Sequence, residues 1–109
     1  HDGGDQALQK VAHLLQSNFR AEDFIFRIGG DEFSVIMNYA DSSLTDLVRE
    51  KFASVRRALA DTSDGLPPIT LSIGVAFSDR KNPTDDIYKD ADSALYQIKE
   101  AGRNGIAFY

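Results

Sequence analysis

The sequence contains no cysteine, which excludes disulfide bonds and thiolate metal sites. It also lacks any run of about eighteen apolar residues, the length at which a stretch becomes a candidate to span a membrane. No signal-peptide pattern is present. These absences are typical of a domain that folds in the reducing cytoplasm. We therefore expect a cytoplasmic domain without direct membrane contact, although other domains of the protein could tether it.

Positive charge is scarce as well. Twelve lysine and arginine residues stand against 17 aspartate and glutamate residues, for a formal net charge of −5. A protein that follows a nucleic-acid backbone normally presents a basic face, so this balance argues against nucleic-acid binding. A site for a single nucleotide would need its few cations concentrated in one place.

The chain has enough apolar content for one compact domain. It is 109 residues long and 42% hydrophobic, which suffices for one core and is too little for two. We therefore expect a single domain over residues 1–109. Since the chain begins with His1 rather than Met, and its first residues already read as the interior of a domain, we expect it to be part of a longer protein.

Hydrophobic periodicity predicts three helices and four short strands. The helices are expected at residues 5–19, 40–61 and 84–102, and the strands at 24–28, 32–39, 69–77 and 105–109. Along residues 69–77, large apolar residues alternate with small ones, so the two sets are expected on opposite faces of the strand. The residues expected on the buried helix faces are Leu8, Val11, Ala12, Leu15 and Phe19, then Leu44, Leu47, Val48, Phe52, Val55 and Leu59, then Ile87, Ala91, Ala94, Leu95, Ile98 and Ala101. The order of elements predicts an α+β fold, a sheet with helices packed on it.

Helix boundaries are expected at polar residues and glycine. Ser42 or Ser43 is the expected N-cap of the second helix, and Thr84 that of the third. Gly102 is expected to end the third helix, because glycine adopts the left-handed conformation that terminates helices.

The stretch RIGGDEFSV places a glycine pair and two adjacent carboxylates between two apolar runs. Such spacing reads as a tight hairpin, with Asp31 and Glu32 at its tip. Carboxylates are suitable ligands for Mg²⁺. Because neighbouring strand side chains point to opposite faces, both can serve one site only if the turn twists them. Considered by itself, this pattern is more often a solvated turn.

Four further motifs accompany GGDEF in a recognisable order: HDGGDQAL, RAED, TLSIGVA and DADSALYQIKEAGRNG. Together they cover nearly the whole chain and resemble the GGDEF family of diguanylate cyclases. The resemblance implies a partial GGDEF fold, related to nucleotide cyclases and polymerase palm domains. It also implies an enzyme that joins two GTP molecules into cyclic di-GMP and releases two pyrophosphates, with Mg²⁺ or Mn²⁺ as cofactor.

The resemblance assigns roles to the hairpin. It makes Asp31 and Glu32 metal ligands and catalytic residues, with Asp31 also the base that helps the attacking 3′-hydroxyl lose its proton. Gly29 and Gly30 would let the backbone approach the nucleotide closely, which a side chain would prevent.

Substrate contacts are implied at both ends of the chain. Asp5 matches the family position that contacts the guanine or ribose of GTP, and His1 matches the histidine of a GH element that lies beside the substrate. Lys99 and Arg103 are four residues apart at the end of the third predicted helix, so they are expected on one face, where they could meet the triphosphate. An alternative for the cations is a favourable interaction with the helix dipole, worth about 0.3–1 kcal/mol. For Asp5 the corresponding alternative is an acid in the first turn of a helix.

Arg20 and Asp23 match the RxxD inhibitory site of the family, where the product cyclic di-GMP binds away from catalysis. A guanidinium can grip guanine O6 and N7 or a phosphate, and a carboxylate can accept hydrogen bonds from guanine. The alternative is an ordinary surface ion pair worth no more than about 1 kcal/mol.

The chain departs from the family in what precedes His1. The first strand of the family, with a further metal-binding aspartate, a Phe-Lys phosphate loop and a guanine-reading asparagine, is not in this sequence. We therefore expect the 109 residues by themselves to have little or no cyclase activity. The favoured interpretation is that residues 1–109 are the C-terminal part of a diguanylate cyclase domain, which acts as a homodimer and follows an upstream sensory or regulatory domain. The alternative is a non-catalytic GGDEF domain that senses cyclic di-GMP or GTP or binds a partner.

Overall fold

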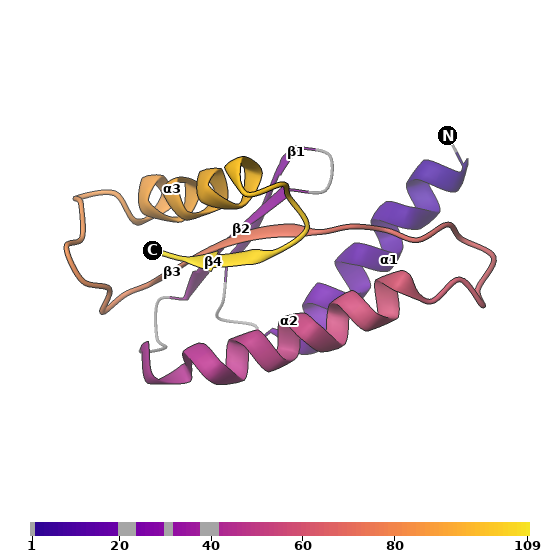
Figure 1. Ribbon diagram of the computed structural model, residues 1–109, viewed down its shortest axis with the longest axis horizontal. Helices are drawn as coiled ribbons and strands as arrows, with labels where there is room; N and C mark the ends of the chain where they lie inside the picture. Colours follow the sequence, from indigo (N-terminus) through magenta and orange to yellow (C-terminus); the bar gives the residue numbers. More distant parts are fainter. Residues whose placement is uncertain (1, 20–23, 30–31, 38–41) are drawn as a thin grey trace.

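The computed structural model of the chain describes residues 2–19, 24–29, 32–37 and 42–109, of which 2–5 and 24–29 are described by their backbone alone. The elements are shown in Figure 1. In chain order they are α1 (Asp2–Asn18), β1 (Phe24–Gly29), β2 (Glu32–Met37), the 3₁₀ turn η1 (Ser42–Leu44), α2 (Thr45–Ala60), β3 (Ser72–Phe77), α3 (Ile87–Glu100) and β4 (Ile106–Phe108). Every helix and strand predicted from the sequence is present.

The described strands form one four-stranded sheet in the order β1-β2-β3-β4. Strands β1 and β2 pair antiparallel, as the predicted hairpin requires, whereas β3 runs parallel to both β2 and β4. Helix α3 covers one face of the sheet, and α1 and α2 cover the other (Figure 1). The predicted α+β fold is confirmed.

Strand β3 divides its side chains by size between the two faces. Ile73, Val75 and Phe77 enter the core shared with α1 and α2. On the α3 face, a Cβ added to Gly74 would lie 2.3 Å from the carbonyl oxygen of Ala91. Only glycine permits this approach, so the alternation in the sequence sets how closely α3 can rest on the sheet.

The predicted helix faces are buried in their central turns. The buried members are Val11, Leu15 and Phe19 in and after α1, Val48, Phe52, Val55 and Leu59 in α2, and Ala91, Ala94 and Leu95 in α3. Leu8 and Leu47 are exceptions at 37% and 46% exposure, and Ala101 is exposed beyond the end of α3. A helical stripe predicts only the direction of a side chain, and burial also requires an element opposite to it.

The expected N-cap of the second helix at Ser42 or Ser43 is wrong. A 3₁₀ turn precedes α2, and Leu44 occupies the cap position without a side-chain hydrogen bond. The Thr45 hydroxyl donates to the Ser42 carbonyl at 2.6 Å, while the Ser42 backbone N–H donates to Asp79 at 2.9 Å. The hydrogen bond to Asp79, 37 residues further along the sequence, is thus made where a side-chain cap by Ser42 or Ser43 was expected.

The expected cap of the third helix at Thr84 is also wrong. Asp86 caps α3 by accepting from the backbone N–H of Tyr88 at 3.0 Å. The Thr84 hydroxyl instead donates to Asp90 at 2.6 Å. Gly102 fulfils its predicted role, because α3 ends at residue 100 and the glycine adopts a φ of 104°.

Asp90 forms a buried ionic network at the start of α3 that the sequence did not suggest. The carboxylate is 1% exposed and accepts from the Arg80 Nε at 2.6 Å and from the Thr84 backbone N–H at 3.0 Å. Desolvation acts to raise the pKa of Asp90, but the hydrogen bonds from Thr84 and Arg80 outweigh it and hold that pKa below its ordinary value. The network fixes the β3–α3 connection to the helix.

Candidate functional site

The GGDEF stretch, which we call the signature, lies in the hairpin of β1 and β2, where the first residue of β2 is brought against the last residue of β1. Glu32 pairs with Gly29 in the antiparallel ladder, next to a shift in register between Arg27 and Gly29. Glu32 is 8% exposed, so its charge needs compensation from neighbouring groups. Gly30 and Asp31 lie outside the described residues, and their assigned roles stay predictions.

Two cations from the far end of the chain compensate the Glu32 carboxylate. Lys99 Nζ lies 3.2 Å from one carboxylate oxygen, and the Arg103 guanidinium donates to the other. We call these residues the Glu32–Lys99–Arg103 cluster. It joins the signature strand to the α3–β4 loop, and its formal charge is positive because two cations surround one anion.

The route by which Arg103 reaches Glu32 differs from the prediction. Arg103 was expected on the same helical face as Lys99, but α3 ends at residue 100. Arg103 adopts a left-handed φ of 68° and its backbone N–H donates to the Ile98 carbonyl at 2.8 Å. The two predicted substrate-binding cations do come together, through a left-handed turn instead of a helical repeat.

The loop that carries Arg103 is anchored to β3. The Asn104 backbone N–H donates to the Ser72 hydroxyl at 2.9 Å. Asn104 also has a positive φ, 54°, a conformation that asparagine tolerates better than most residues. These contacts hold the loop where Arg103 can meet the end of β2.

Sequence reasoning missed a second polar pair on the α3 side of β2. Ser34, 3% exposed, donates from its hydroxyl to Asp92 at 2.9 Å. Ser34 follows Glu32 by two residues, so both lie on the same face of the strand. The alternation of side chains along a strand was therefore the signal in the sequence that could have identified Ser34 as a neighbour of Glu32.

The structure leaves the predicted divalent cation untested. No group of three or more histidine, aspartate and glutamate side chains suited to a metal occurs among the described residues. Glu32 is the one carboxylate of the cluster, and both its oxygens face cations. Mg²⁺ or Mn²⁺ therefore stays a prediction, one that also requires Asp31.

The remaining predicted site residues lie at the edge of what is described or beyond it. The backbone of Asp5 belongs to α1, consistent with the predicted first helix. His1, Arg20 and Asp23 lie outside the described residues. Within the described part of the chain, none of the helices is long and apolar enough to cross a membrane.

Comparison with known proteins identifies the family of this chain. The chain matches the family described as "Diguanylate cyclase, GGDEF domain" over residues 1–105. The chain belongs to the GGDEF family. The signature hairpin of this GGDEF domain and its Lys99–Arg103 segment, separate in the sequence, are therefore parts of one family pattern that the fold brings together.

Several relatives of this GGDEF domain have "diguanylate cyclase" in their names. It is 36% identical over 107 residues to "Diguanylate cyclase DgcM" of Escherichia coli (strain K12), covering 97% of this chain and 25% of the relative. It is 40% identical over 110 residues to "Probable diguanylate cyclase DgcC" of the same strain, covering 95% of this chain and 28% of the relative. For "Probable diguanylate cyclase DgcT", also from that strain, the identity is 33% over 111 residues, covering 97% and 24%. The chain thus spans about a quarter of the length of these relatives.

Proposed function

We propose that this GGDEF domain is the catalytic domain of a diguanylate cyclase that condenses two GTP molecules into cyclic di-GMP. The 3′-oxygen of each GTP would attack the α-phosphorus of the other. The bond from that phosphorus to the β-phosphate oxygen would break, and one pyrophosphate would leave from each GTP. Asp31 is the proposed acceptor of the hydroxyl proton. The single observation that supports this proposal most directly is the convergence of Lys99 and Arg103 on the signature residue Glu32.

The cluster suggests how the domain would receive a triphosphate. Lys99 and Arg103 are 35% and 55% exposed in their side chains, whereas that of Glu32 is 11% exposed. A phosphate group could therefore reach the cations from solvent while Glu32 stays behind them. Guanidinium and ammonium groups form strong charge-assisted hydrogen bonds to phosphate oxygens. GTP would take over hydrogen bonds now made to Glu32.

The predicted inhibitory site and the predicted homodimer belong to the same proposal. One domain would hold one GTP, and the two nucleotides must face each other, which an isologous pair of domains permits. Cyclic di-GMP bound at Arg20 and Asp23 would lower activity by favouring an arrangement that keeps the two active sites apart.

The test is a turnover assay on the full-length protein that contains this domain. We expect GTP and Mg²⁺ to yield pyrophosphate and a product with the mass of cyclic di-GMP. Asp31→Ala should abolish synthesis with an unchanged circular dichroism spectrum, because an acid at a hairpin tip contributes little to a core. GTP binding without turnover in the parent would instead favour the sensor function. Near-normal synthesis by Asp31→Ala would refute the assignment of Asp31.

A further inference from the structure

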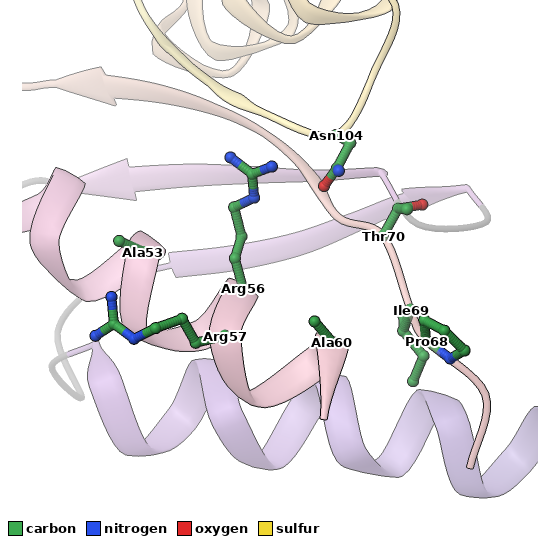
Figure 2. A pocket seen from close by; sticks show the side chains of 8 residues that line it. All are labelled: Ala53, Arg56, Arg57, Ala60, Pro68, Ile69, Thr70 and Asn104. Carbon is green, nitrogen blue, oxygen red and sulfur yellow. The ribbon is translucent and has the colours of Figure 1, made fainter. Parts of the chain in front are cut away.

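A groove of about 490 Å³ opens between the C-terminal half of α2 and the segment that leads into β3. Figure 2 shows the side chains that line it. Asn104, which lies next to Arg103 in the chain, contributes to one wall. The volume falls within the range of small-molecule sites, roughly 300–1,000 Å³. No residue of the Glu32–Lys99–Arg103 cluster lines the groove.

Two consecutive arginines supply positive charge to this groove. Arg56 and Arg57 leave α2 in different directions, Arg56 on the side of Asn104 (Figure 2). The Arg56 guanidinium carbon lies 5.6 Å from the centre of the Phe52 ring, a contact that supports the extended side chain. Within the described part of the chain, neither guanidinium forms an ion pair with a carboxylate. No carboxylate of the described residues therefore competes with an anion for these two guanidinium groups.

Apart from Thr70 and Asn104, the other residues that line the groove are small or apolar. Ala53 and Ala60 on α2 leave space beside the arginines, and Pro68 and Ile69 form an apolar wall opposite. The Ile69 backbone N–H donates to the Leu59 carbonyl at 3.0 Å. This bond ties the two walls together, so the groove does not have to form when a ligand binds.

We propose that this groove binds a nucleotide-sized phosphate ester. Its phosphate would lie on Arg56, since the guanidinium fork matches the geometry of phosphate oxygens, and Arg57 would add positive charge from its own side of the groove. Its planar or apolar part would lie against Pro68 and Ile69, with the Asn104 amide as a hydrogen-bond partner. Inorganic phosphate would fill little of the space and would leave the apolar wall uncovered. The proposal does not depend on cyclase activity.

Binding titrations of the chain with GMP and with inorganic phosphate, at fixed ionic strength, test this proposal. Replacing both arginines (Arg56→Ala with Arg57→Ala) should weaken GMP binding about tenfold or more, because charge-assisted hydrogen bonds are lost. The matched control removes two exposed lysines outside the groove (Lys81→Ala with Lys89→Ala) and should leave the affinity unchanged. In the chain without substitutions, GMP should shift the NMR signals of the Asn104 side-chain amide and the Ile69 backbone amide.

Several results would overturn the proposal. They are unchanged GMP affinity in the double arginine variant, an equal loss in the lysine control, and inorganic phosphate binding as tightly as GMP. Lys99→Ala separates this groove from the proposed substrate site: persistent binding supports the groove, and loss of GMP binding assigns it to the Glu32–Lys99–Arg103 cluster. If the double arginine variant does not fold, the NMR shifts that GMP causes in the chain without substitutions test the proposal instead. Unperturbed Asn104 and Ile69 signals then refute the site.

Discussion

At the scale of single residues, Glu32 is the position where the structure adds most to the sequence. Its identity within the signature suggested a metal ligand. Its surroundings show a carboxylate whose two oxygens are engaged by Lys99 and Arg103. Glu32 therefore already pairs with the two cations that we propose bind the triphosphate. An anionic ligand must compete with Glu32 for Lys99 and Arg103.

This competition predicts the behaviour of Glu32→Gln. Without divalent metal, the variant should bind pyrophosphate about two- to thirtyfold more tightly than the parent. Both cations are partly exposed, an ion pair of this kind is worth roughly 0.2–1 kcal/mol, and two such pairs are lost. Isothermal titration calorimetry in a chelating buffer measures the effect. Lys99→Ala is the opposite control and should weaken binding. Weaker pyrophosphate binding by Glu32→Gln would show that Glu32 does not compete for these cations.

At the scale of elements, the contact between β3 and α3 depends on one missing side chain. A Cβ at Gly74 would meet backbone atoms of Ala91 and Leu95 at 2.3 and 2.4 Å, and backbone of a packed helix cannot move aside as the end of a flexible side chain can. The helix and strand must therefore separate if this residue gains a methyl group.

Gly74→Ala should lower the free energy of unfolding by about 1–3 kcal/mol through overpacking. Urea denaturation followed by circular dichroism measures this loss. Gly105→Ala is the matched control, because its Cβ would approach nothing closer than the Ile98 side chain at 3.4 Å. Equal stability of the two variants would mean that α3 does not rest on the sheet at Gly74.

The Asp90 network predicts a pH dependence at the same scale. Since the folded-state pKa of Asp90 lies below its ordinary value of 3.8, its contribution is fully present above that value and is lost as the pH falls through the folded pKa. Asp90→Asn should be less stable than the parent at neutral pH, because Arg80 stays buried without its partner. Its urea midpoint should also fall less than that of the parent on acidification from about pH 6 to about pH 3.

The nearby exposed residue Asp85 supplies the control for this measurement. Asp85→Asn removes the same charge, and its midpoint should follow that of the parent across the acid range. A parallel loss of stability in the parent and in Asp90→Asn would show that Asp90 makes no contribution that depends on its ionisation.

At the scale of the whole molecule, the proposed reaction needs more than one copy of this domain. A single site would hold one GTP, whereas the product contains two nucleotides. Each chain carries a formal charge of −5, so two copies repel each other at long range and association must come from specific contacts, which salt would assist by screening.

The specific activity of the full-length protein should therefore rise with protein concentration in the range where it dimerises. Turnover measured beside sedimentation velocity compares the two quantities directly. Constant specific activity from a demonstrated monomer would contradict the two-domain reaction.

The sequence by itself determined which segments form helices and strands and, for the strand predicted at residues 69–77, which face of the sheet its residues occupy. These features follow from local periodicity: the alternation along residues 69–77 correctly separated the large apolar residues from the small ones. It overestimated the length of this strand, which begins at Ser72. Ile69 hydrogen-bonds to Leu59 instead of joining the sheet.

Only the tertiary structure decided which polar residues act together. Glu32 and Arg103 are 71 positions apart, and Ser42 depends on Asp79 where a local cap was expected. The sequence placed Lys99 and Arg103 on one helix, but a left-handed turn after Gly102 directs Arg103 to Glu32. Periodicity records which way a side chain points along its own element, whereas ion pairs and grooves form between elements, whose distance and orientation are set by packing of the whole chain.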